Sequence, residues 1–202
     1  ELNTTLTSMH EKNMYKQLVF YMEACESWSM FEGVLSDDLG IYATTASNAE
    51  ESSYGCYCGA EATVDGTLIG SCLGDLYSVS WLEDSDSLRE LLSETLEDQY
   101  QLVKEETYES HVREYGDDSY SSSEKICDFQ TSGTGCTDAK PAPHTDAIKR
   151  KGVVSSRDAK LHTLMANHIL PSDSKNGHAS EQLVVDEVHA RDAADEQYRK
   201  IV

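Results

Sequence analysis

Residues 17–29, QLVFYMEACESWS, decide the fold of this chain. An apolar run rich in β-favouring residues ends abruptly at Cys25, which two carboxylates flank. A short continuous run of this kind predicts a strand that is buried on both faces, as in a parallel sheet. Because ligands and reacting groups collect at the carboxyl ends of such strands, Cys25 stands where a nucleophile would stand.

The position of Cys25 does not by itself make it a nucleophile. Most free cysteines behave as small buried hydrophobic residues. Glu23 and Glu26 also act against activation, because nearby negative charge disfavours the thiolate. The neighbouring residues supply no base, so activation would depend on a group elsewhere in the protein.

Strands and helices alternate along the chain on both sides of this run. Residues 1–13 have the spacing of an amphipathic helix, and residues 41–47 alternate and β-branch like a core strand. Residues 76–81 are expected to form another short strand. A capping-box pattern at Ser87 and Glu90, with apolar residues at helical spacing as far as Val103, predicts one long helix. This order predicts a doubly wound α/β sheet.

Four separated blocks of the sequence resemble, in the same order, the second half of the catalytic domain of the legumain family, the asparaginyl endopeptidases of plant vacuoles and animal lysosomes. They are VFYMEACESWSMFEG (19–33), IYATTASNAEESSYGCYC (41–58), CLGDLYSVSWLEDSD (72–86) and SHVREYGD (110–117). The plant members look the more similar. A weaker resemblance continues at SSRDAKLHTL (155–164), which is similar to the start of the family's helical prodomain.

The resemblance implies a caspase-like, doubly wound α/β fold that is truncated at its amino end. Residues 1–116 would form the carboxyl-terminal part of a cysteine peptidase domain. Residues 117–148, rich in Ser, Gly, Thr and Pro, would form a linker, and residues 149–202 an incomplete, helical prodomain-like tail. Within the tail, helices are expected from Ser155 to Leu170, where Pro171 stops the first, and from Ser180 to Ile201.

The resemblance also assigns roles to single residues. Cys25 matches the nucleophile that forms an acyl-enzyme, and its own backbone N–H would contribute to the oxyanion hole. Glu23, Ser53 and Asp75 match residues of the pocket that receives the side chain before the scissile bond. Carboxylates and a hydroxyl suit a carboxamide, which is both donor and acceptor, so cleavage after Asn is expected, and after Asp at acid pH. No cofactor and no metal are expected.

Two departures from the family pattern limit this assignment. The family's general base is a histidine followed by glycine, upstream of the segment matched here, and none of the seven histidines of this chain precedes a glycine. The chain alone is therefore expected not to hydrolyse peptides. Trp28 stands where the family usually has glycine, and its ring either narrows the site or folds onto the surface beside Met30 and Phe31. The alternative function is a non-catalytic peptide-binding or regulatory relative, or an inactive fragment.

The cysteines and one sequon point to the secretory route. The resemblance implies a disulfide between Cys58 and Cys72, whose loop of about fifteen residues would contribute roughly 3 kcal/mol. Cys56 would stay a buried thiol, because its spacing to Cys58 is too short for a zinc site. Cys127 and Cys136 could also bridge. Asn3-Thr4-Thr5 is an acceptor for N-glycosylation.

Charge divides the chain into an acidic body and a balanced tail. Residues 1–139 hold 6 Lys and Arg against 28 Asp and Glu, and residues 140–202 hold 10 against 9, so the net charges of −22 and +1 give the total of −21. Nucleic acid is an improbable partner for so acidic a body. Protein or peptide substrates and the chain's own tail are the expected partners. No membrane is expected, and the location would be the vacuole or lysosome, reached with a signal peptide that is not in this chain.

Overall fold

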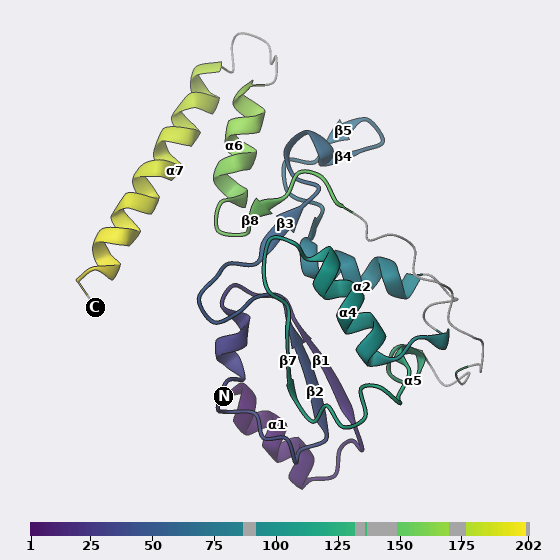
Figure 1. Ribbon diagram of the computed structural model, residues 1–202. Helices are drawn as coiled ribbons and strands as arrows, with labels where there is room; N and C mark the ends of the chain where they lie inside the picture. The colour runs from purple at the N-terminus through teal and green to yellow at the C-terminus, as the bar shows by residue number, and fades with distance from the viewer. Residues whose placement is uncertain (87–91, 132–135, 137–148, 170–176, 201–202) are drawn as a thin grey trace. The chain divides into compact units, whose positions relative to one another are not determined.

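The computed structural model describes residues 1–86, 92–131, 136, 149–169 and 177–200 (Figure 1). The chain divides into two compact units, the first with residues 1–54 and 75–149 and the second with residues 55–74 and 150–202. The Cys25 strand therefore belongs to the first unit. The tail helices share the second unit with the segment that contains Cys58 and Cys72.

A three-stranded sheet of order β1-β2-β7 is the centre of the first unit. Strand β1 (Leu18–Met22) runs parallel to β2 (Ile41–Thr45), and β7 (Arg113–Gly116) pairs with β2 in the antiparallel sense. The strand expected before Cys25 and the strand expected at residues 41–47 are confirmed. Every residue of β2 is buried, which explains its continuous run of apolar and β-branched side chains.

Helices cover both faces of this sheet, because successive side chains of a strand point to opposite faces. Ile41 and Ala43 pack on one face against helix α1 (Leu2–Glu11), which confirms the helix expected at residues 1–13. Tyr42 packs on the other face, which helices α2 (Leu76–Asp86) and α4 (Leu96–Glu106) cover (Figure 1). The first unit thus has a mixed α/β architecture.

Residues 76–81 are helical, so the strand expected there is wrong. The alternation in LYSVSW imitates a strand, but Tyr77 and Trp81 lie one helical turn apart and pack into the same core cluster. The Tyr77 hydroxyl also lies 2.7 Å from Oγ1 of Thr44 in β2. Packing of large side chains at helical spacing therefore prevails over the local β propensity.

The single long helix expected from Ser87 to Val103 is also wrong. Helix α4 begins only at Leu96, after an N-cap at Thr95, and the two expected cap residues lie outside the described part of the chain. Thr95 Oγ1 accepts the N–H of Asp98 at 3.1 Å, while the Asp98 carboxylate accepts the N–H of Thr95 at 3.2 Å. This reciprocal capping box fixes where α4 starts.

Residues just after β7 belong to the body, where the sequence predicted the start of a linker. Tyr120 is buried, and its hydroxyl lies 3.2 Å from the carbonyl oxygens of Leu18 and Gly40, where β1 and β2 begin. Helix α5 (Ile126–Gln130) follows, with Ile126 fully buried. A disulfide joins Cys127 in α5 to Cys136, as the sequence allowed.

The second unit combines a disulfide-closed segment with the tail. Its elements are β3 (Tyr54–Cys56), the 3-10 helix η2 (Gly59–Glu61), β4 (Thr63–Val64), β5 (Thr67–Leu68), β6 (Gly74–Asp75), β8 (Val154–Ser155), α6 (Ala159–Ile169) and α7 (Gly177–Tyr198). Strands β6, β3 and β8 form one sheet in that order. The disulfide between Cys58 and Cys72 is present, and both expected tail helices are confirmed. No helix in the described ranges has the length and apolarity needed to cross a membrane.

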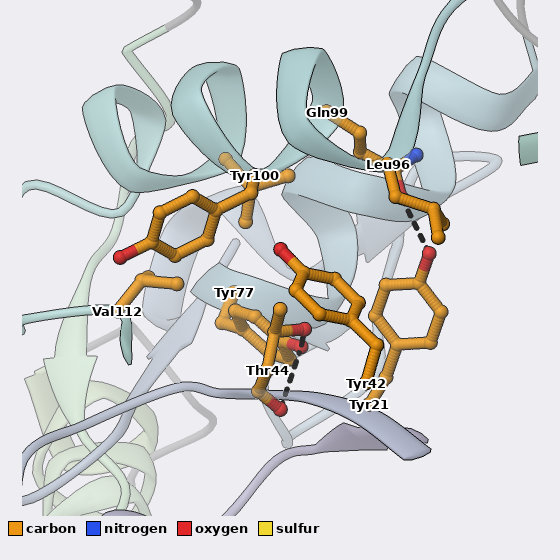
Figure 2. Close-up of a pocket in the computed structure, with 9 residues that line it drawn as sticks. Tyr21, Tyr42, Thr44, Tyr77, Leu96, Gln99, Tyr100 and Val112 are labelled. Atoms are coloured by element: carbon orange, nitrogen blue, oxygen red, sulfur yellow. Dashed lines mark hydrogen bonds between the residues drawn. The ribbon is translucent and has the colours of Figure 1, made fainter. Parts of the chain in front are cut away.

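A small cavity lies in the core of the first unit, between the sheet and helix α4 (Figure 2). Four tyrosines line it, together with Gln99, whose Oε1 accepts the hydroxyl of Tyr21 at 2.6 Å. The cavity volume is about 10 Å³, which suffices for at most one water molecule. This space is too small for a peptide side chain.

Replacing the cap of α4 should destabilise the first unit. We expect Thr95→Ala to cost about 1 kcal/mol, because the N–H of Asp98 loses its acceptor. For a chain of this size, that corresponds to a melting temperature lower by about 2–4 °C in calorimetry. Thr95→Ser keeps the hydroxyl and should melt close to the original chain; equal losses in both variants would contradict the capping argument.

Candidate active site

Cys25 lies in a tight turn at the carboxyl end of β1. The next residue, Glu26, adopts a left-handed conformation with φ of 48°, and the 3-10 helix η1 (Ser27–Met30) follows at once. A non-glycine residue in this conformation costs roughly 1–3 kcal/mol and persists only where the surroundings hold it. The turn presents the half-exposed Cys25 side chain at the edge where β1 and β2 both end.

The Cys25 thiol meets a hydroxyl from the loop that follows β2. Its Sγ lies 3.7 Å from Oγ of Ser53, which is buried. This contact arises because parallel pairing brings the carboxyl ends of β1 and β2 to the same edge. Two residues that the sequence placed in the site are thereby brought together from positions 28 apart.

Glu23 is the strongly perturbed acid of this region. Burial, followed by the negative charge of Asp75, raises its pKa to about 7, against the lowering effect of hydrogen bonds from Ser78 and Ser53. One carboxylate oxygen, Oε2, accepts the N–H of Ser78 in the first turn of α2 at 2.8 Å. The other oxygen, Oε1, is buried and has no hydrogen-bond partner among the described residues.

Asp75 completes the group of residues selected from the sequence. It is exposed as a residue and immediately precedes helix α2, while partial desolvation of its carboxyl raises its pKa. Its charge acts on Glu23, and Ser53 lies near both Cys25 and Glu23. The site thus joins a thiol, a hydroxyl and two carboxyl groups, one of which has an unused buried acceptor. Such a set offers hydrogen-bond donors and acceptors of the kind that suit a carboxamide, beside a half-exposed thiol.

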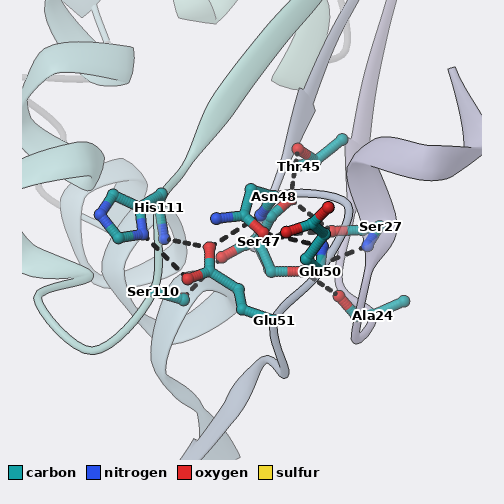
Figure 3. Close-up of polar contacts among 10 residues, drawn as sticks. Ala24, Ser27, Thr45, Ser47, Asn48, Glu50, Glu51, Ser110 and His111 are labelled. Carbon is teal, nitrogen blue, oxygen red and sulfur yellow. Dashed lines mark hydrogen bonds and ion pairs between the residues drawn. The ribbon is translucent and has the colours of Figure 1, made fainter. Parts of the chain in front are cut away.

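A pair of serines binds the Cys25 turn to the β2 loop (Figure 3). The hydroxyls of Ser27 and Ser47 lie 3.1 Å apart, and each accepts the backbone N–H of the other residue at 3.1 Å. The Ser47 hydroxyl also donates to the carbonyl of Ala24 at 3.0 Å. Both serines are fully buried, so these bonds form away from competing water.

A second connection, which the sequence did not predict, joins Glu51 and His111. The Glu51 carboxylate accepts the N–H of Asn48 at 2.8 Å and the N–H of His111 at 2.7 Å, and it lies 2.9 Å from Nδ1 of the same imidazole (Figure 3). Burial raises the pKa of Glu51, but these hydrogen bonds outweigh it and lower the pKa overall. The one available signal was the acidic pair Glu50-Glu51 in the loop after the core strand β2.

Trp28 packs against β7. Its ring lies 5.2 Å from the guanidinium of Arg113 and 5.7 Å from the ring of Tyr115. The indole therefore makes a cation–π contact, of the kind that is worth about 0.5–1 kcal/mol at exposed sites. The sequence offered two places for this ring, the mouth of the site or the surface beside Met30 and Phe31. Neither expectation included a contact with Arg113, because that residue is distant in the chain.

The remaining candidate residues lie elsewhere. Asn3 is in the first turn of α1, with its Oδ1 buried, and Cys56 is fully buried and takes part in no described disulfide, as expected. Of the described histidines, His10 Nδ1 bonds to the carbonyl of Leu39. Cys127, Asp128 and Cys136 are close enough to share a metal ion, but the two sulfurs are bonded to each other and are not thiolate ligands.

Comparison with known proteins identifies a peptidase family. Residues 1–132 match the model of the Peptidase C13 family. A vacuolar-processing enzyme of Vicia sativa is 55% identical over 121 residues, which are 58% of this chain and 24% of that protein. Mouse legumain is 50% identical over 130 residues, 64% of this chain and 28% of that protein. Bovine legumain is 38% identical over 203 residues, which cover 100% of this chain and 44% of that protein. The chain thus spans less than half the length of these curated relatives.

The buried carboxyl of Glu23 should make stability depend on pH. Its pKa in the fold is about 7 against an ordinary 4.5, so the folded chain holds this proton more tightly than the unfolded chain does. Stability therefore falls as pH rises from about 4.5 to about 7, by on the order of 2 kcal/mol. Glu23→Gln should remove this loss when melting temperatures at pH 5.0 and 7.5 are compared. Glu32→Gln, on the exposed surface, should keep it; the same pH difference in the Glu23 variant would refute the assignment.

Proposed function

Because this chain belongs to the Peptidase C13 family, we propose that Cys25 is the nucleophile of a cysteine endopeptidase that cleaves peptide bonds after asparagine. The observation that carries the proposal is the meeting of Cys25, Ser53 and Glu23 at one edge of the sheet. The family match supports a cysteine peptidase in general. The specificity for asparagine rests on the chemistry of the pocket residues.

The proposed reaction begins with attack of the Cys25 thiolate on the carbonyl carbon of the scissile bond. The carbonyl oxygen gains the negative charge, and the C–N bond then breaks to leave an acyl-enzyme and a free amine, which takes up a proton. Water attacks the thioester and releases the acid and the thiol. No hydrogen bond within the described residues occupies the Cys25 N–H, so this group is free to donate to the oxyanion.

The pocket chemistry favours a carboxamide. Oε1 of Glu23 is buried and has no partner within the described ranges, so it can accept an N–H of an asparagine side chain, while a side chain that lacks this donor leaves the oxygen unsatisfied. Below its pKa of about 7, the Glu23 carboxyl carries a proton, so one oxygen can still accept from an asparagine amide while the O–H can donate to a carboxylate. This added donor would admit aspartate at acid pH.

The general base of the reaction is proposed to come from outside this chain. Cys25 contacts Ser53, whereas the described His10 and His111 bond to Leu39 and Glu51. The same observation favours the second candidate function, a peptide-binding or regulatory relative that retains the pocket without turnover.

The names of the relatives also support a vacuolar or lysosomal location.

We further propose that the acidic body attracts the tail through charge. The tail begins with the basic cluster Lys149-Arg150-Lys151, whereas residues 1–139 carry a net charge of −22 by the count given above. This attraction weakens only when carboxylates lose charge, so X-ray scattering of the chain should show tail release near pH 4–5 and none at pH 6. A tail already detached at neutral pH and low salt would contradict the proposal.

Labelling of Cys25 tests the function directly. At pH 5.5 we expect a peptide-like asparaginyl electrophile to add one adduct at Cys25 of an amino-terminally extended product and none to the 202-residue chain, as read by intact mass. Cys25→Ser should abolish the adduct, and the fully buried Cys56 should stay unmodified. If the extended product binds the peptide without an adduct, the peptide-binding function replaces the peptidase.

A further inference from the structure

We propose that Glu51, held by His111, is a positioning residue that sets the place of Cys25 relative to Ser53. The inference rests on the proposed function, because it concerns the geometry of the same nucleophile. Glu51 contacts three segments of the first unit. Its backbone carbonyl binds the turn after β1, and its carboxylate binds its own loop after β2 and the segment that leads into β7. Figure 3 shows the two contacts of the carboxylate.

The Cys25 turn takes its shape from the loop after β2. Three successive backbone N–H groups of the turn donate into that loop: Glu26 to the carbonyl of Glu51 at 2.7 Å, Ser27 to the Ser47 hydroxyl at 3.1 Å, and Trp28 to the carbonyl of Ser47 at 3.2 Å. The first of these bonds involves the left-handed residue directly after the nucleophile. The turn therefore follows any movement of Glu51.

The loop, in turn, is held by the Glu51 carboxylate. Through the N–H of Asn48 the carboxylate closes the loop on itself, and through the N–H and Nδ1 of His111 it anchors the loop beside β7. Ser110 strengthens the same anchor, because its hydroxyl donates to the carbonyl of Ala46 at 2.7 Å. A single carboxylate with several donors fixes a loop more strongly than any one of these bonds could.

The short sequence spacing lets this anchor set the distance between Cys25 and Ser53. Glu51 lies two residues before Ser53, and its carbonyl binds the residue one position after Cys25. Only short chain segments therefore separate Glu51 from Cys25 on one side and from Ser53 on the other. The distance of 3.7 Å between Cys25 Sγ and Ser53 Oγ depends on both segments. Catalytic groups need placement within about 0.5 Å, so loss of the anchor should affect reaction geometry before it affects folding.

Amide hydrogen exchange of the 202-residue chain tests the anchor. Glu51→Ala should speed exchange at Glu26 by about tenfold or more, and His111→Ala, at a side chain 69% exposed, should speed it less without unfolding the chain. Exchange within β1 should stay unchanged. Glu50→Ala is the matched control, because it removes the exposed carboxylate of the neighbouring residue. The backbone N–H at position 50 can still donate to Oδ1 of Asn48 in this variant. Unaltered exchange at Glu26 in both the Glu51 and His111 variants would overturn the proposal.

Two electrophiles separate positioning from stability in the amino-terminally extended product. Glu51→Ala should slow modification of Cys25 by the asparaginyl electrophile about tenfold, while iodoacetamide, which needs no bound orientation, should react at the original rate or faster. Glu51→Gln, which keeps an acceptor oxygen, should recover part of the loss. Equal slowing of both reagents would refute positioning. If the unaltered extended product fails to react with the asparaginyl reagent, the proposed function fails, and the exchange experiment still decides the role of Glu51.

Discussion

The parallel pairing of β1 with β2 is the constraint on which the site depends. Residue-by-residue register from Leu18 with Ile41 to Met22 with Thr45 forces both strands to end at the same edge. The turn that holds Cys25 and the loop that holds Ser53 therefore lie side by side, although the two residues are 28 positions apart in the sequence. Antiparallel pairing of the same two strands would have placed these groups at opposite ends of the sheet.

The site is built at a cost to local stability that the surrounding structure offsets. A left-handed Glu26 and a buried Glu23 carboxyl, with one oxygen unpaired among the described residues, are each unfavourable in isolation. The buried bonds of Ser27 and Ser47, together with the N-terminal turn of α2, hold them in place. A strained backbone residue and a desolvated carboxyl therefore lie together where the proposed chemistry takes place.

The sequence predicted those parts of the fold that depend on local pattern. The apolar runs at β1 and β2 and the resemblance of four blocks were sufficient for the mixed α/β class and for the candidate residues. Residues 76–81 were misassigned, because the alternation of Tyr77 and Trp81 with small residues becomes helical only through packing against Thr44 and its neighbours. The bond between Glu51 and His111 joins positions 60 apart, a distance at which a single sequence carries no pairing signal.

Tyr120 has a consequence for where this domain can be divided. By reaching the carbonyls of Leu18 and Gly40, it closes the end of the sheet opposite to Cys25 with a residue from beyond β7. A chain cut after Gly116 would lack Tyr120 and would leave these carbonyls and the ring of Tyr42 open to water. A division that preserves the sheet therefore lies no earlier than the end of helix α5 at Gln130.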